Sequence, residues 1–237
     1  MVILYSCSVD AQIIEGELRD EVIIENGVFK VWYSEVKEQP KKLVYTSTNR
    51  VKNVDRGSMN FYTEGEVVTS NNADYYRNVW DKGHLAPAAT YSDSMENLKQ
   101  TFSFLNCALQ DQYLNRGEWR LLEEKEREWD DQSNLTITVE LVWDEGFEIL
   151  PTGGHVPTHM IKHIKFDKDN TWRCFEFPNA KPLVGWEEVE VQHDLQKAAG
   201  YEGSILRKNA PYECKRSWTL MKVKDFSDAE ATIIGFE

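Results

Sequence analysis

The sequence has few cysteines and no long apolar run. Its four cysteines, Cys7, Cys107, Cys174 and Cys214, form no CxxC pair, which excludes zinc knuckles and thioredoxin-like motifs. We expect them to be free thiols. No apolar run approaches the roughly 20 residues of a membrane helix, and residues 1–9 lack the basic region and cleavage site of a secretory signal. These absences predict a cytoplasmic or intracellular protein without a membrane partner, and they leave secretion by another route open.

Positive charge is also scarce. The 27 lysines and arginines face 40 aspartates and glutamates, which gives a formal net charge of −13. Proteins that coat nucleic acid usually present a basic face, so this balance excludes that class. It does not exclude an enzyme with a local basic cleft, because the local field depends on where the charges lie. The most basic stretch contains Lys41, Lys42, Arg50, Lys52 and Arg56.

The composition and the residue patterns indicate one globular domain of mixed α+β class. Hydrophobic residues make up 41% of the chain and charged residues 28%, and no repeat or low-complexity linker divides it. Residues 21–33 predict a hairpin, in which Asn26-Gly27 favours a type I′ turn. Further strands are predicted at 43–46, 135–143, 160–166, 172–177, 218–223 and 231–236, and helices at 95–102, 114–123 and 189–199.

Two stretches concentrate polar chemistry. Residues 80–87, WDKGHLAP, place an acid, a base, a glycine and one of only five histidines together, and Pro87 predicts that regular structure stops there. About thirty residues later, LNRGEWRLLE at 114–123 predicts an amphipathic helix with a carboxamide in its first turn and a carboxylate two turns on. Gly117 costs about 1 kcal/mol relative to alanine inside a helix, which suggests that another group approaches the backbone closely.

The spacing of His155, His159 and His163 is also that of a zinc site on a helix. Gly153, Gly154 and Pro157 interrupt such a helix, however. The segment from residue 160 has strand character, in which residues four apart lie about 13 Å from each other. The helix interruptions and the strand character therefore argue against a zinc site.

Taken together, DKGHLAPA and the LNxGxWxxLE helix resemble the DNA/RNA non-specific endonuclease family, the endonuclease G-like ββα-metal (His-Me finger) nucleases. The similarity runs in order along the chain, through residues 22–27, 32–34, 39–40, 45, 81–88, 104–106, 114–123, 156–159 and 177–179. The resemblance implies an α+β fold with a mainly antiparallel sheet and helices. It also implies a single nuclease domain over 1–237, with the ββα-metal core at about 80–130.

The resemblance assigns His84 as the general base, and an ordinary histidine pKa of about 6.5 suits a base near neutral pH. It makes Asn115 the direct ligand of Mg²⁺, for which Mn²⁺ can substitute. Glu123 lies about 12 Å further along a straight helix, but its side chain leans back toward the helix N-terminus. Glu123 is therefore expected to hold the metal through water.

The remaining site residues follow from the same resemblance. Asn106 is expected beside the catalytic cluster, which it supports by hydrogen bonding, and Arg56 is expected to contact the phosphate, with Arg50 as the alternative. Lys82 stands where the family usually has arginine and adds positive charge. Asp81 and Gly83 are expected to shape the backbone around the histidine.

The function implied is a Mg²⁺-dependent endonuclease that cleaves DNA and RNA and leaves 5′-phosphate ends. Two alternatives stay open: a catalytically silent relative that binds nucleic acid or protein, and a nuclease of narrow substrate range, which the net charge of −13 favours. A homodimer and an inhibitor protein are further expected partners. The chain departs from the family at residues 105–110, LNCALQ, which lack the usual serine and proline, and at 144–146, where the usual TGP is absent.

Overall fold

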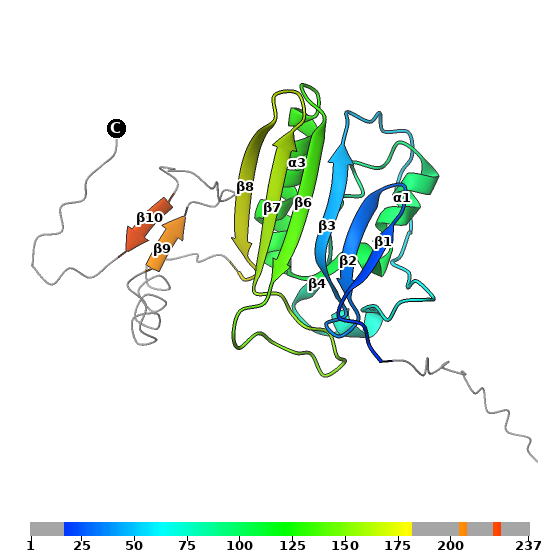
Figure 1. Ribbon diagram of the computed structural model, residues 1–237, viewed down its shortest axis with the longest axis vertical. Coiled ribbons are helices and arrows are strands. Elements are labelled where there is room, and N and C mark those ends of the chain that lie inside the picture. The colour runs from blue at the N-terminus through cyan, green and yellow to red at the C-terminus, as the bar shows by residue number, and fades with distance from the viewer. Residues whose placement is uncertain (1–16, 182–203, 208–219, 224–237) are drawn as a thin grey trace, which may run out of the picture.

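A six-stranded sheet forms the framework of the computed structural model, which describes residues 17–181, 204–207 and 220–223. The strands follow the order β1-β2-β3-β6-β7-β8, and every neighbouring pair is antiparallel (Figure 1). They are β1 (Val22–Glu25), β2 (Phe29–Ser34), β3 (Gln39–Ser47), β6 (Leu135–Val142), β7 (His159–Phe166) and β8 (Thr171–Pro178). The prediction of a mixed fold with a mainly antiparallel sheet is confirmed.

Several predictions from the sequence fall on residues near the two ends of the chain, few of which the structure describes. Strands β9 (Ser204–Arg207) and β10 (Leu220–Val223) pair antiparallel. The predicted helix at 189–199, the predicted strand at 231–236 and the segment 1–9 lie outside the described residues, as do Cys7 and Cys214. Neither Cys107 nor Cys174 is in a disulfide bond. Among the described residues, no helix is both long enough and apolar enough to cross a membrane.

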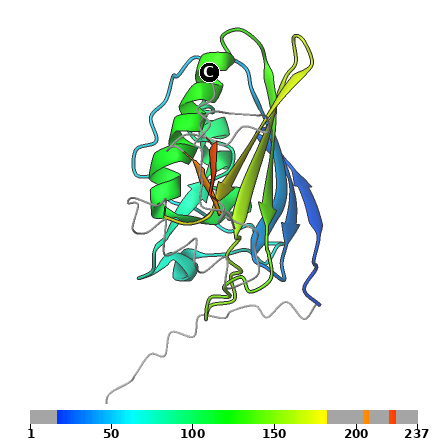
Figure 2. The ribbon, with the colours of Figure 1, turned by 90° about the vertical axis from the view of Figure 1, so that its left-hand side faces the viewer.

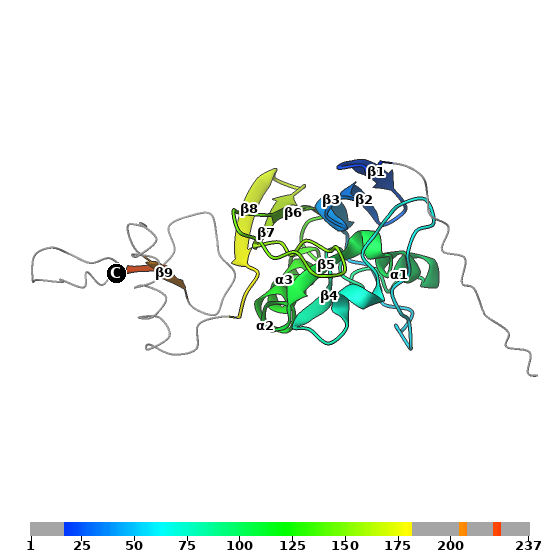
Figure 3. The ribbon, with the colours of Figure 1, turned by 90° about the horizontal axis from the view of Figure 1, so that it is seen from below.

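One face of the sheet carries the core. Along β6, Leu135, Ile137, Val139 and Leu141 are buried and alternate with more exposed residues, which is the period of a half-buried strand. Helix α3 (Arg120–Trp129) and the small sheet of β4 (Trp80–His84) and β5 (Cys107–Asp111) pack on that side, so the described body has two layers (Figures 2 and 3).

The first hairpin has the predicted strands but a different turn. A type I′ turn requires positive φ at both central residues, and neither Asn26 nor Gly27 has it. The Asn26 side chain shapes the turn instead, because its Oδ1 accepts hydrogen bonds of 2.9 Å from the backbone N–H groups of Val28 and Phe29. The prediction of a type I′ turn was therefore wrong.

A second departure concerns the stretch around the histidine. The residue pattern predicted no strand at residues 80–84, but they form β4 and pair with β5 along its whole length. The segment between these strands contains α1 (Met95–Thr101) and the short helix η2 (Phe104–Asn106). Ser92 and Ser94 were both candidate N-caps of α1, and Ser94 is the cap. A further short helix, η1 (Asn72–Tyr75), precedes β4. Strands β4 and β5 and the helical segment after them form the predicted ββα unit.

The helical segment after β5 is not the single α-helix that was predicted. It starts with α2 (Gln112–Leu114), widens into a π-helical turn η3 (Asn115–Trp119), and only then becomes α3. Gly117 breaks the helix with φ −106° and ψ −108°, and a Cβ there would meet no atom within 4 Å. The predicted close approach to Gly117 was therefore wrong, and the 12 Å helical spacing of Asn115 and Glu123 does not apply.

Candidate active site

A polar cleft of about 430 Å³ lies where β4, the helical segment after β5 and the loop before β4 meet. It contains six of the eight residues predicted for the site. The cleft is lined by Arg56, Met59, Asn60, Phe61, Asp81, Lys82, His84, Pro87, Ala88, Ala89, Asn115 and Glu123.

His84 is the last residue of β4, and aromatic rings enclose its imidazole. The centroid of that ring lies 4.6 Å from the centroid of Phe61 and 4.9 Å from that of Phe102. Burial, together with the positive charge of Arg56, lowers the pKa of His84 to about 3. Its Nε2 is buried and has no hydrogen-bond partner in the described part of the chain. His84 is therefore a neutral imidazole at the wall of the cleft, as a general base must be before it accepts a proton.

The backbone around His84 is held from below by Asn106. Its Oδ1 accepts a 2.7 Å hydrogen bond from the backbone N–H of Ala86, and its Nδ2 donates to the carbonyl oxygens of Ala86 and Thr101 at 2.9 and 2.8 Å. Asn106 is fully buried and does not line the cleft. Asn106 was grouped with the catalytic residues and expected to support them by hydrogen bonding. Its hydrogen bonds position the turn that follows His84.

Gly83 lies under the cleft as well, where β4 passes close to β5. A Cβ at Gly83 would lie 2.1 Å from Oε1 and 2.7 Å from Cβ of Gln110. Only glycine fits this approach without displacing one of the strands. The absence of a side chain at residue 83 therefore fixes the position of the residue that follows it.

Asn115 faces the cleft from the π-helical turn, and Asp81 fixes its orientation. Nδ2 of Asn115 donates a 2.9 Å hydrogen bond to Oδ2 of Asp81, and Arg116 makes a bidentate ion pair with the same carboxylate at 2.8 and 2.7 Å. The carboxamide therefore turns its N–H end to β4. Its Oδ1 is left as an oxygen ligand for the cleft.

Glu123 lines the cleft from α3. Burial raises the pKa of its carboxyl to about 7, and the positive charge of Lys162 opposes this shift. A divalent cation in the cleft would favour the ionised form, because an opposite charge nearby stabilises a carboxylate. Glu123 is therefore suited to bind a cation and is costly to ionise without one.

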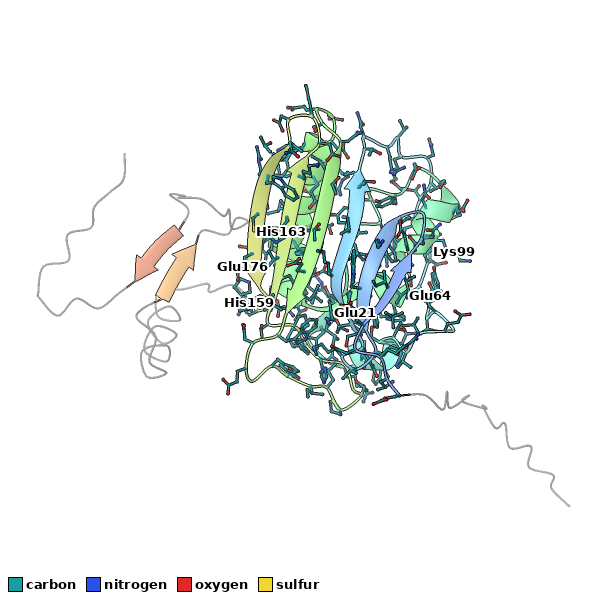
Figure 4. All side chains as sticks on the ribbon, viewed as in Figure 1. Glu21, Glu64, Lys99, His159, His163 and Glu176 are labelled. Atoms are coloured by element: carbon teal, nitrogen blue, oxygen red, sulfur yellow. The ribbon has the colours of Figure 1, made fainter. Side chains whose placement is uncertain are left out.

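The donor set suits a hard cation that keeps most of its water. Mg²⁺ takes oxygen ligands and is often held by only one or two side chains, as Asn115 and Glu123 would provide. Within the described residues, no group of three or more His, Cys, Asp or Glu side chains could hold a metal ion. His159 and His163 lie on β7 away from the cleft, on the sheet face opposite α3 (Figure 4), where Nδ1 of His159 is 2.8 Å from Oδ2 of Asp144.

The two arginines proposed for the phosphate contact differ in position. Arg56 lines the cleft, whereas Nη1 of Arg50 lies 3.5 Å from Oδ2 of Asp93 and outside the lining. Lys82 also lines the cleft, and its Nζ donates to Oδ1 of Asn72. The cleft therefore contains two cationic side chains within an acidic chain.

Behind the cleft lies a buried ion pair that the sequence analysis missed. Nζ of Lys162 donates a 2.8 Å hydrogen bond to Oε1 of Glu126, and the Tyr45 hydroxyl donates to Oε2 at 2.6 Å. Lys162 Nζ also lies 4.2 Å from the ring centroid of Trp119, whose Nε1 donates a 3.2 Å hydrogen bond to the carbonyl oxygen of His84. This network connects β7, α3 and β4.

A signal for this pair was present in the sequence. Lys162 lies between Met160 and Ile164 on the inward face of a predicted strand, where a charged side chain needs a buried partner. The cleft residues Met59 and Asn60 were also missed, because they belong to a loop with no periodic pattern.

The sequence of the chain is similar to those of known mitochondrial nucleases. The chain is 29% identical over 201 residues to the mitochondrial nuclease EXOG of Xenopus laevis, covering 71% of this chain and 54% of that protein. It is 28% identical over 156 residues to the mitochondrial nuclease EXOG of Danio rerio, covering 56% and 41%. Mitochondrial endonuclease G of Bos taurus is 36% identical over 76 residues, covering 31% and 25%. The chain thus matches about half or less of the length of these relatives.

The fold is shared with a solved structure of the EndoG/EndoGI complex, which concerns the mechanism of EndoG inhibition. Its TM-score is 0.60 at 24% identity, over 71% of this chain and 82% of that chain. The family model described as DNA/RNA non-specific endonuclease matches residues 19–204. Because this match covers most of the sequence, the chain belongs to the DNA/RNA non-specific endonuclease family.

Proposed function

We propose that this protein is a metal-dependent endonuclease that hydrolyses phosphodiester bonds in DNA and RNA. The observation that carries the proposal is that a neutral His84 and the oriented carboxamide of Asn115 line one cleft. Family membership supports nuclease chemistry in general. We further propose individual roles for the residues that line the cleft.

Hydrolysis of a phosphodiester needs an activated water, stabilisation of charge at phosphorus and protonation of the leaving 3′ oxygen. His84 accepts the proton of the attacking water, because its imidazole is neutral and one nitrogen is unengaged. Arg56 donates hydrogen bonds to a non-bridging phosphate oxygen, and Lys82 adds positive charge at the same wall. Water adds to phosphorus as the P–O3′ bond breaks, and the leaving 3′ oxygen takes a proton from solvent water. The phosphate therefore stays on the 5′ end.

Asn115 would hold Mg²⁺ directly and Glu123 would hold it through water, and Mn²⁺ would substitute for it. When bound, the ion supplies positive charge at the phosphate and at the leaving oxygen. Asp81 orients the ligand oxygen of Asn115 without touching the ion. Metal dependence is general in this family, which supports this assignment.

The silent-relative alternative is less favoured, because packing alone does not require histidine, asparagine and glutamate around one cleft. A narrow substrate range has one observation in its favour, the net charge of −13, which weakens non-specific binding of nucleic acid. Rates on duplex DNA, single-stranded DNA and RNA at low and moderate salt distinguish this alternative from a broad nuclease. A broad nuclease cleaves all three.

Plasmid nicking tests the proposal directly. The wild type is expected to nick with Mg²⁺ and not with EDTA, and His84→Ala is expected to lose about 10² to 10⁴-fold in rate. His163→Ala is the matched control, because His163 lies on the sheet face opposite α3, and its activity should equal the wild type. Activity that survives both EDTA and His84→Ala excludes the mechanism. No cleavage of any nucleic acid at low salt favours the silent relative.

We propose an inhibitor protein as a partner and a single nuclease domain as the unit it binds. The EndoG/EndoGI complex supports an inhibitor partner, because in it a protein with the same fold is inhibited. The single domain is supported by the largest core cluster of the described residues, which joins the main sheet to β5, to α3 and to the turn after β4. Sedimentation of the purified protein would also show whether it forms the expected homodimer.

A further inference from the structure

A side pocket opens beside the cleft. It has a volume of about 600 Å³ and is lined by Met59, Asn60, Tyr62, Lys99 and Phe102. Met59 and Asn60 line the cleft as well, so the side pocket adjoins the cleft. The proposed chemistry uses none of this space.

Phe102 forms the partition between the cleft and the side pocket. Its ring centroid lies 4.9 Å from that of His84, the proposed base, and 5.0 Å from Cζ of Arg56, the proposed phosphate contact. The ring of Phe102 therefore contacts both residues proposed to act at the phosphate and also lines the side pocket. Whatever occupies it belongs to a nucleotide close to the bond that is cleaved.

Tyr62 presents an aromatic wall that is held in place. Its backbone N–H donates a 3.0 Å hydrogen bond to the carbonyl oxygen of Phe102, and its carbonyl oxygen accepts one of 2.9 Å from Phe104. The Tyr62 hydroxyl hydrogen-bonds to Glu64, and Glu64 accepts a 2.9 Å bond from Oγ of Ser103. A ring fixed in this way loses little conformational entropy when a ligand stacks on it.

Charge around the side pocket suits a nucleotide. None of its five lining residues is acidic, although the chain has 40 aspartates and glutamates. Lys99 belongs to α1 and lines the side pocket, and Cζ of Arg56 lies 5.0 Å from the ring centroid of Phe102. Aromatic surface next to cations is what binds the base and the phosphates of a single strand.

We propose that the side pocket binds one unpaired nucleobase of the substrate, next to the scissile phosphate. This inference rests on the proposed nuclease function. Tyr62 and Met59 contact the flat face of the base, Asn60 hydrogen-bonds its edge, and Lys99 contacts the adjoining phosphate. Stacking tolerates any base, because every base has a π-face. The side pocket therefore accepts an unpaired base without selecting for sequence.

The test uses single-stranded oligonucleotides with one ordinary phosphodiester among nuclease-resistant phosphorothioate linkages, which keep the negative charge that Lys99 contacts. An abasic residue is moved through the three positions on either side of the cleavable bond. We expect KM to rise by about 5- to 100-fold for an abasic residue at one position and less than about twofold elsewhere. Tyr62→Leu should remove this difference. Tyr76→Leu should retain it, because Tyr76 is 66% exposed and lies outside the side pocket.

The outcomes separate the two proposals. Equal KM for every abasic position overturns the side pocket and leaves the nuclease intact. No cleavage of any strand with Mg²⁺ overturns the nuclease, and the side pocket is then decided by binding of a 2-aminopurine strand to the wild-type protein. Quenching that is lost in Tyr62→Leu supports a stacked base. Fluorescence of the 2-aminopurine strand that does not change when the wild-type protein binds overturns the proposed stacking.

Discussion

Oδ2 of Asp81 accepts a 2.9 Å hydrogen bond from Nδ2 of Asn115 and thereby connects β4 to the π-helical turn after β5. An ionised carboxylate only accepts hydrogen bonds, so the amide end of Asn115 must face it. The oxygen end of the same carboxamide is left for the cleft. Asp81 is thus a positioning residue for the proposed metal ligand.

Asp81→Ala is expected to weaken the apparent affinity for Mg²⁺ by about 10- to 100-fold, because the carboxamide is no longer oriented. The measurement is the Mg²⁺ dependence of the nicking rate. Arg116→Ala is the control, since it removes only the exposed partner of the same carboxylate and should change the affinity little. A wild-type Mg²⁺ dependence in Asp81→Ala would contradict this role.

Glu123→Gln is expected to stabilise the metal-free protein at alkaline pH while it weakens activity. The folded-state pKa of Glu123 is about 7, above its ordinary value of 4.5, so the stability present below pH 4.5 is lost as pH rises through 7. The variant does not ionise and should gain about 1 to 3 kcal/mol over the wild type at high pH.

Urea unfolding in EDTA at about pH 5 and pH 8 measures this difference, and other groups that titrate cancel between the two proteins. The gain of Glu123→Gln over the wild type should be larger at the higher pH. An equal difference in unfolding free energy at both pH values would show that Glu123 ionises normally.

The acid limb of the pH–rate profile should depend on Mg²⁺ and not on His84. His84 stays neutral well below its ordinary pKa of 6.5, because burial lowers its pKa to about 3. Protonation of Glu123 near pH 7 competes with metal binding instead. Raising Mg²⁺ should therefore move the limb to lower pH. A limb near pH 6.5 that ignores the Mg²⁺ concentration assigns it to a histidine with an ordinary pKa.

Gly83→Ala is expected to lower both stability and activity. The new Cβ would lie 2.1 Å from Oε1 of Gln110, and overpacking of this kind costs about 1 to 3 kcal/mol. The shift of β4 also moves His84. Gly65→Ala is the matched control, because its Cβ would meet nothing within 4 Å. Thermal unfolding and nicking of both variants test the point, and equal effects would refute it.

Several elements could be predicted from sequence because their signals are local. Alternating β-branched residues predicted β6, and Ser92 or Ser94 before an apolar helical pattern predicted the start of α1. The hairpin of β1 and β2 was predicted as well. Its turn was not, because Asn26 uses its side chain to bind the backbone in place of a positive φ.

The errors concern structure that distant contacts decide. Residues 80–84 have no strand pattern, and they form β4 because β5, more than twenty residues later, pairs with them. The π-helical turn at 115–119 is not visible in a helical pattern that continues through it. The site residues Arg56 and Glu123 were predicted to act together, and the structure brings them to one cleft. Asn106, predicted as catalytic, lies beneath it.

The central claim is that His84 accepts the proton of the attacking water while Asn115 holds the metal. Single-turnover cleavage by His84→Ala, with and without added imidazole at saturating Mg²⁺, tests it most directly. We predict a loss of about 10² to 10⁴-fold. Imidazole should restore part of that loss in His84→Ala and none of the loss in Asn115→Ala. A His84→Ala protein that cleaves within tenfold of the wild type, or an equal response of both variants to imidazole, would contradict the account.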